Sequence, residues 1–263
     1  MMRIDWARFS IGASALAIYV FMYAPILVLI IYSFQDSRVL TWPLGDWSLR
    51  WYVSLAENRQ LLQAIGNSLI VATSCVAITT IFGVALAMAL RGAGTRIAAV
   101  LERMILMPLI VPQLVTGLAV LLVLNRSDVQ LSLLTIILGQ SIVWMPIVVT
   151  QVYARLMALP PEIEQAARDL GANPVQTFFL ITLPSISTAV AGSALLVFTL
   201  SFDELPVTFF LTGSENTLPM FIWSMMRVGI TPEINAIATI TVIGSIVMIA
   251  LGTKLLLNKN TKV

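Results

Sequence analysis

Two adjacent carboxylates, Asp203 and Glu204, interrupt an apolar run that extends from about Ile186 to Leu211. No lysine or arginine lies close to them in the sequence, and an unpaired charge in an apolar medium is costly. Ionisable residues inside such runs usually face a bundle interior or a path for a solute. The pair therefore predicts a binding point for a cationic solute. The alternative is that the acids are simply exposed to solvent at the end of a helix.

The position of the pair along the run bears on both interpretations. If a helix begins near Ser187, Asp203 lies about 24 Å further along it, in the outer part of a membrane. Neighbouring residues on a helix diverge by about 100°. We therefore expect one acid to face the path and the other to face a protein neighbour or an outer entry. Pro206 should loosen the helix here and free carbonyl groups toward the path.

Aromatic side chains are the natural companions of such acids, because their rings bind alkylammonium groups through cation–π contacts. Trp51 and Trp223 are candidates on the outer side, and Phe202 lies beside the acids. Tyr153 is a further candidate at the inner end of an apolar run. For each of these residues, the more common role is an anchor at the membrane interface.

The composition identifies the setting in which these residues act. The chain of 263 residues is 59% hydrophobic and 11% charged, with a mean hydropathy of +0.94, whereas soluble domains carry roughly 25% charged residues. The chain is therefore predicted to be an integral membrane protein. Its single cysteine and its lack of histidine exclude an internal disulfide framework and a His/Cys metal site.

Six apolar runs are long enough to cross a bilayer about 30 Å thick as helices. We expect these spans at about residues 11–34, 69–90, 104–124, 131–152, 186–211 and 234–257, within a single transmembrane domain covering 1–263. With the N-terminus in the cytoplasm, the inner segments carry most of the 15 lysines and arginines, as the positive-inside rule requires. Six spans then place both termini in the cytoplasm.

The segment between the fourth and fifth runs, about residues 160–185, reads as two short helices. Pro160 and Pro161 favour a helix start, and Gly171 favours its end. Asn173 is a good cap for a second helix, which we expect to stop near Pro184. Such a helix–turn–helix on the cytoplasmic face is either a docking element or a hairpin that merely connects two spans.

This segment is similar to the EAA loop of ABC importer permeases. The pattern of that family is Glu-Ala-Ala, three residues, Gly, nine residues, Ile, one residue and Leu-Pro. The matching positions are Ala166, Ala167, Gly171, Ile181, Leu183 and Pro184. Gln165 stands where the family has glutamate, and Glu164 directly precedes it.

The resemblance implies an all-α integral membrane protein with the type I ABC importer permease architecture: six transmembrane helices and a cytoplasmic coupling loop. In that family the loop sits in a cleft of an ATPase subunit, and here Arg168 and Asp169 would pair with charges on that partner. Gln165 keeps an acceptor but lacks the charge, which puts one salt bridge in question. The chain has no Walker A motif. ATP and Mg²⁺ would therefore be used by the partner, and the chain itself would be no enzyme and bind no cofactor or metal.

The stretch 201–239 resembles the permeases of spermidine/putrescine importers, especially the second of their two permease subunits. That subfamily carries two acids here, then a Phe-x-x-Gly turn, a Leu-Pro and a Pro-Glu-Ile/Val-Asn-Ala-x-Ala-Thr run. The matches are residues 210–213, 218–219 and 232–239, and residues 23–37 and 49–52 are also similar. Relatives often have an acid where this chain has Gln113. One contact to the cation would therefore be weaker here, or would come from the other subunit.

The resemblance also implies a set of partners. They are a second, homologous permease subunit that completes a heterodimer, two copies of a cytoplasmic ATPase subunit, a periplasmic or extracellular polyamine-binding protein and membrane lipid, without nucleic acid. The expected location is the bacterial inner membrane, which the chain would cross several times. Two alternatives remain: the same architecture carrying another small organic or cationic solute, or a secondary cation transporter.

Overall fold

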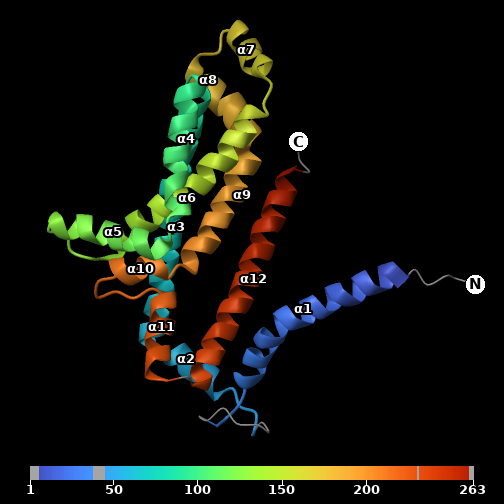
Figure 1. Ribbon diagram of the computed structural model, residues 1–263, viewed down its shortest axis with the longest axis vertical. Helices are drawn as coiled ribbons and strands as arrows, with labels where there is room; N and C mark the ends of the chain where they lie inside the picture. The colour runs from blue at the N-terminus through green and yellow to red at the C-terminus, as the bar shows by residue number, and fades with distance from the viewer. Residues whose placement is uncertain (1–5, 38–44, 230, 261–263) are drawn as a thin grey trace, which may run out of the picture. The chain divides into compact units, whose positions relative to one another are not determined.

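The computed structural model describes residues 6–37, 45–229 and 231–260 (Figure 1). Within these ranges every regular element is a helix, apart from an isolated bridge between Gln35 and Trp47. Five of these helices are long and apolar enough to span a membrane, and a bent pair makes a sixth if it forms one span. The all-α membrane fold predicted from the sequence is confirmed.

By their internal contacts, the described residues form two compact units. The first unit takes its residues from Met1–Arg59 and Ile222–Val247, and the second from Gln60–Phe221 and Met248–Val263. The helices α11 (Leu218–Val228) and α12 (Pro232–Asn260) each contribute to both units. The single domain over 1–263 stays a prediction.

The first unit joins a long helix to a short one. Its complete helices are α1 (Trp6–Tyr32) and α2 (Arg50–Glu57). The indole N–H of Trp51 in α2 donates to the carbonyl of Gln35, 2.7 Å away. The hydroxyls of Ser33 and Tyr52 lie 2.6 Å apart. These contacts fix the short helix to the end of the long one.

The second unit contains the elements that position the candidate residues. They are α3 (Arg59–Gly92), α4 (Thr95–Ile110), α5 (Gln113–Arg126), α6 (Leu133–Met157), α7 (Pro161–Asp169), α8 (Pro174–Thr177), the π-helical turn η1 (Phe178–Thr182), α9 (Leu183–Phe202) and α10 (Pro206–Leu211). Within this unit α7 and α8 lie at one end, well away from α5 and α10 (Figure 1).

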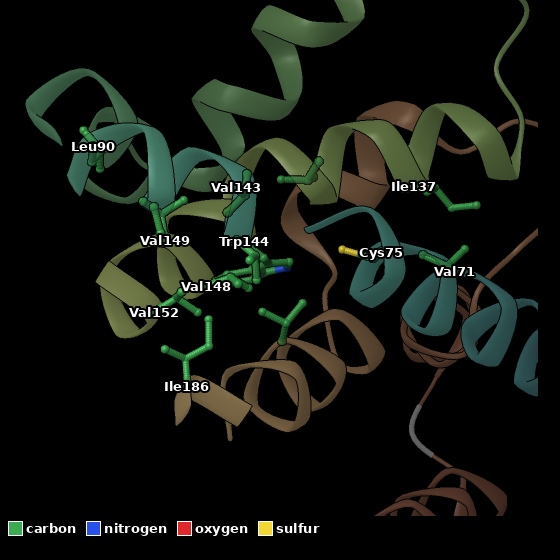
Figure 2. Packing of buried hydrophobic residues seen from close by; sticks show 14 of the residues in the cluster. Val71, Cys75, Leu90, Ile137, Val143, Trp144, Val148, Val149, Val152 and Ile186 are labelled. Atoms are coloured by element: carbon green, nitrogen blue, oxygen red, sulfur yellow. The ribbon is translucent and has the colours of Figure 1, made fainter. Parts of the chain in front are cut away.

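The core of the second unit is built from small and β-branched side chains. Cys75 of α3, Val148 and Val152 of α6 and Ile186 of α9 are all buried in one cluster (Figure 2). Close approach of α3 and α6 depends on Gly83, because a Cβ there would lie 2.9 Å from the Val148 Cβ. Small residues at such crossings let membrane helices pack backbone against backbone.

The span expected at 104–124 is not one straight helix. Instead, α4 ends at Ile110, α5 begins at Gln113, and the two are bent by 102° (Figure 1). Val111 and Pro112 are both extended, with ψ of 132°. A proline disfavours the helical conformation of the residue before it and removes one backbone donor, and both effects favour this break.

The boundaries of the fifth span also differ from the prediction. The helix does not stop near Pro184 but runs from Pro174 through η1 to Phe202. In the wider π turn the Leu183 N–H donates to the Phe178 carbonyl, and the helix continues past Pro184 although proline supplies no donor there. At the other end, the helix expected to reach Leu211 stops at Phe202, and Pro206 starts the separate helix α10.

Candidate transport site and coupling loop

The carboxylate of Glu204 is buried in the break between α9 and α10, with only 4% of the residue exposed. It accepts the backbone N–H groups of Val207 at 2.6 Å and Thr208 at 3.0 Å. It also accepts the Thr208 hydroxyl at 2.7 Å and the Gln140 side-chain amide at 3.3 Å. Glu204 therefore caps the N-terminus of α10, where free N–H groups and the helix dipole favour an anion.

A polar network extends from Glu204 to the neighbouring helices. The Gln140 amide of α6 also donates to the Thr208 hydroxyl at 2.9 Å. The Ser201 hydroxyl at the end of α9 donates to the Gln140 side-chain oxygen. Each donor in this buried set has an acceptor, which is the condition under which a polar network stabilises a core. The network holds α6, α9 and α10 in one arrangement.

The short helix α10 is also wedged against α5 and α6 at glycines. A Cβ on Gly117 of α5 would lie 3.0 Å from the Val207 Cα, and a Cβ on Gly139 of α6 would collide with the Leu211 side chain. At the far end of α10, the Thr135 hydroxyl lies 2.9 Å from the Leu211 carbonyl. The position of α10 is therefore fixed by packing as well as by Glu204.

We expect Gly139→Ala to lower the free energy of unfolding by about 1–2 kcal/mol, because the added methyl group overpacks the contact with Leu211. Gly192→Ala is the matched control, since a Cβ there has nothing within 4 Å and alanine favours a helix interior. Thermal unfolding of the purified protein measures both. Equal unfolding temperatures for the two variants would show that α10 is free to shift.

Asp203, unlike its neighbour, is exposed at the C-terminal end of α9. Its side chain makes no hydrogen bond or ion pair with any residue that the structure describes. The two adjacent acids thus have different environments. The Glu204 carboxylate accepts four internal hydrogen bonds, whereas the Asp203 carboxylate is exposed.

Three of the other residues predicted along the path, Phe202, Gln113 and Tyr153, belong to the second unit, as the acids do. Phe202 is buried and stacks on Phe198 with ring centroids 6.1 Å apart, so its face is already used within α9. Gln113 is half-buried at the start of α5, next to the bend. Tyr153 is half-buried and packs against the core cluster of α6.

The two candidate tryptophans, Trp51 and Trp223, belong to the first unit. Trp51 is only 8% exposed, its N–H is taken by Gln35, and the Arg50 guanidinium lies over its ring, 4.4 Å from the centroid. One face of the Trp51 ring is therefore covered by an internal cation, and a role for Trp51 on the solute path stays a prediction. Trp223 on α11 is 38% exposed.

The predicted coupling loop, about residues 160–185, has the turn conformations that the sequence predicts. Gly171 adopts a φ of +88°, the left-handed conformation that glycine favours after a helix. Asn173 and Gln176 then cap α8 reciprocally, each side chain accepting the other's backbone N–H at 2.9 Å. The reversal between α7 and α8 therefore follows from Gly171 and Asn173.

The residues predicted to couple to an ATPase divide into an exposed outer set and a more buried inner set. Gln165, Ala166, Arg168, Asp169 and Pro184 are exposed, whereas Ala167 is buried and Ile181 and Leu183 are half-buried. Leu170, between Asp169 and Gly171, is 89% exposed. Apart from Pro184, which lies at the start of α9, the outer set and Leu170 form a mixed polar and apolar surface on α7 and the turn that follows it.

Glu164 is turned inward instead. Its Oε1 accepts the Arg91 guanidinium and the Thr182 hydroxyl, each at 2.8 Å. Partial burial opposes ionisation, but the hydrogen bonds from Thr182 and Arg91 and the positive charge of Arg91 outweigh it and lower the pKa of Glu164 below its ordinary value. The Glu164 side chain therefore stays ionised at neutral pH.

Sequence reasoning missed the partners of both inward-facing acids. Gln140, Ser201 and Thr208 are uncharged and lie in or beside apolar runs, where nothing in the sequence marks them as partners of Glu204. Arg91 stands at the end of an apolar run, where nothing in the sequence marks it as a partner of Glu164. A usable signal did exist at α10: a proline is common at the first position of a helix, and Pro206 follows Glu204 by two residues.

Comparisons with known proteins agree with this architecture. Residues 79–257 match the family described as binding-protein-dependent transport system inner membrane component. The chain is 39% identical over 230 residues to the putrescine transport system permease protein PotI of Escherichia coli (strain K12), covering 84% of this chain and 82% of that one. It is 34% identical over 253 residues to the spermidine/putrescine transport system permease protein PotC of the same organism, covering 95% of each.

Solved structures show the same fold at low sequence identity. A chain of a bacterial ABC transporter involved in the import of the acidic polysaccharide alginate aligns with a TM-score of 0.79 at 15% identity, over 97% of this chain and 96% of that one. A chain of the MetNI methionine ABC transporter aligns with a TM-score of 0.63 at 15% identity, over 74% and 94%. The chain is therefore a multi-pass inner-membrane permease that belongs to the family of binding-protein-dependent transport system inner membrane components.

Proposed function

We propose that this chain is one of two homologous permease subunits of an ATP-driven importer for a polyamine, putrescine or spermidine. The observation that carries the proposal is the environment of Asp203, an exposed carboxylate at the end of a membrane helix with no cationic partner among the described residues. The names of the relatives PotI and PotC point to the same class of solute. A protonated amine supplies the charge that such a carboxylate lacks.

The break between α9 and α10 gives the carboxylate a fixed place. Glu204, Gln140 and Thr208 hold the start of α10, so Asp203 stands at the end of a rigid helix rather than on a loose loop. Preorganised groups bind a solute with less ordering cost than flexible ones. In this account, Asp203 meets the amine and Glu204 positions the helix end that carries it.

The same helix connects the acid to the coupling loop. From Pro174 through η1 to Phe202 the helix is continuous, so a displacement of the loop moves the end that carries Asp203. We propose that two copies of a cytoplasmic ATPase bind ATP and Mg²⁺ and drive this displacement, one copy acting on the outer set of α7. An external polyamine-binding protein delivers the solute, a second permease completes the path, and both termini face the cytoplasm.

The turn at Gly171 provides a test of docking. Gly171→Val is expected to reduce co-purification of the ATPase subunit, because a β-branched residue at φ +88° is strained by roughly 1–2 kcal/mol and should distort the turn. Gly171→Asn is the control, since asparagine tolerates the left-handed conformation. Full co-purification with Gly171→Val, at an unchanged unfolding temperature, would argue against α7 as the docking element.

The reaction class is tested in proteoliposomes that contain the whole complex and an external binding protein. Labelled putrescine uptake should require ATP at the face that carries the ATPase and should persist when a protonophore collapses the proton gradient. Uptake that follows the gradient and ignores ATP would favour the secondary cation transporter. Uptake of a different solute by an ATP-dependent complex would keep the architecture and replace the cargo.

A further inference from the structure

Glu164 joins the coupling loop to two membrane helices through a single oxygen atom. Its Oε1 receives Arg91, in the last turn of α3, and Thr182, in the π turn that leads into α9. The residue itself lies on α7. Three elements that are distant in the chain thus meet at one carboxylate.

The acid is turned away from the surface that would meet a partner. Gln165, at the position where the family pattern has glutamate, is exposed, whereas Glu164 is half-buried. Adjacent helix positions diverge by about 100°, so the acid at position 164 points inward, whereas position 165 points outward. The charge on this turn of α7 serves an internal contact.

This ion pair differs from an ordinary surface pair. The Glu164 and Arg91 side chains are each only 21% exposed, so solvent screens their attraction less than it would at an open surface. The Thr182 hydroxyl fixes the same oxygen from a second direction. The geometry therefore restrains both the distance and the orientation of α7.

An open pocket adjoins the ion pair. Its volume is about 340 Å³, and its lining includes Met88 and Gly92 of α3 and Phe178 of η1. The π turn beside it is a wide, irregular part of the helix, of the kind often found at functional sites. The helix α7 packs on α8 and η1, and the carboxylate is what connects it to α3 across this space.

We propose that Glu164 is a positioning residue that makes α7 move together with α3 and α9 when the ATPase acts on the loop. The inference rests on the proposed function. Without the carboxylate, α7 moves partly into the pocket without displacing α3, and less of its displacement reaches the helix that carries Asp203. Glu164 touches neither nucleotide nor solute in this role.

The test compares Glu164→Gln with Glu162→Gln, an exposed glutamate on the same turn of α7. In the reconstituted complex, Glu164→Gln should lower the number of solute molecules moved per ATP hydrolysed by about two- to fivefold. ATPase co-purification and the unfolding temperature should stay unchanged. The charge swap Glu164→Arg with Arg91→Glu should recover part of the loss.

A second readout does not depend on the identity of the solute. Hydrogen exchange of the α7 amides in the purified complex should be faster in Glu164→Gln than in Glu162→Gln. Equal stoichiometry and equal exchange in the two variants would overturn the proposal, as would a loss explained entirely by lost ATPase binding. Absence of polyamine uptake in the unmodified complex would refute the proposed function alone, because the exchange comparison would still decide the role of Glu164.

Discussion

Asp203→Asn is expected to reduce the rate of polyamine uptake roughly 10- to 100-fold at low solute concentration. A hydrogen bond to a charged group contributes about 1.5–3 kcal/mol, and each 1.4 kcal/mol is a factor of ten. Asparagine has nearly the same shape as aspartate but offers only a neutral acceptor to an ammonium group. The loss should appear mainly in the concentration needed for half-maximal uptake, because Asp203 is proposed to bind the solute.

Asp128→Asn is the matched control for this variant. Asp128 is an exposed acid with a φ of +50°, a conformation that asparagine adopts readily, so the substitution removes a charge without strain. Uptake should be near the unmodified level. Because the Asp203 side chain makes no hydrogen bond or ion pair among the described residues, Asp203→Asn should leave the unfolding temperature unchanged. Normal uptake by Asp203→Asn would remove this residue from the path.

Glu204→Ala is expected to destabilise the protein by about 3 kcal/mol or more. The buried N–H groups of Val207 and Thr208 would lose their acceptor, at about 1–3 kcal/mol each, and the space of the side chain would be left empty. The unfolding temperature of the purified complex should fall, and uptake should fall because α10 and the end of α9 lose their fixed arrangement.

The contrast between the two acids makes this prediction specific. Asp203→Asn should lower uptake at constant stability, whereas Glu204→Ala should lower stability first. Thr208→Val removes one hydroxyl of the network but leaves the carboxylate that accepts the two backbone N–H groups. It should therefore cost less than Glu204→Ala. Glu162→Ala is the surface control and should change neither property. A stable Glu204→Ala variant that binds the solute weakly would instead place Glu204 on the path.

The features that the sequence predicts well are those that depend on neighbours in the chain. Hydropathy locates α1, α6 and α12 to within about five residues at both ends, because a span needs a long apolar run whatever it packs against. It also locates the end of α3, but this helix begins at Arg59, well before the expected start at residue 69, because its first turns are more polar. Gly171 and Asn173 predict the loop reversal for the same local reason. Each of these signals is complete within a few residues.

The features that the sequence does not predict depend on contacts across the chain. Hydropathy alone does not indicate that the helix stops at Phe202, because residues 206–211 are as apolar as those before them. Pro206 marks the start of α10 locally, but the place of α10 depends on what it packs against. The cap on α10 is completed by Gln140, which is 64 residues from Glu204. The burial of Trp51, whose indole N–H donates to the carbonyl of Gln35 16 residues away, likewise depends on the fold.

The central claim, that the complex moves a polyamine by ATP hydrolysis, is tested most directly by competition. The initial rate of ATP-dependent labelled putrescine uptake is measured in proteoliposomes, against an excess of spermidine or of a neutral diol of the same length as putrescine. The account predicts uptake that spermidine suppresses and the diol leaves unchanged. A complex that hydrolyses ATP but takes up no polyamine, or whose uptake the diol suppresses equally, would contradict it.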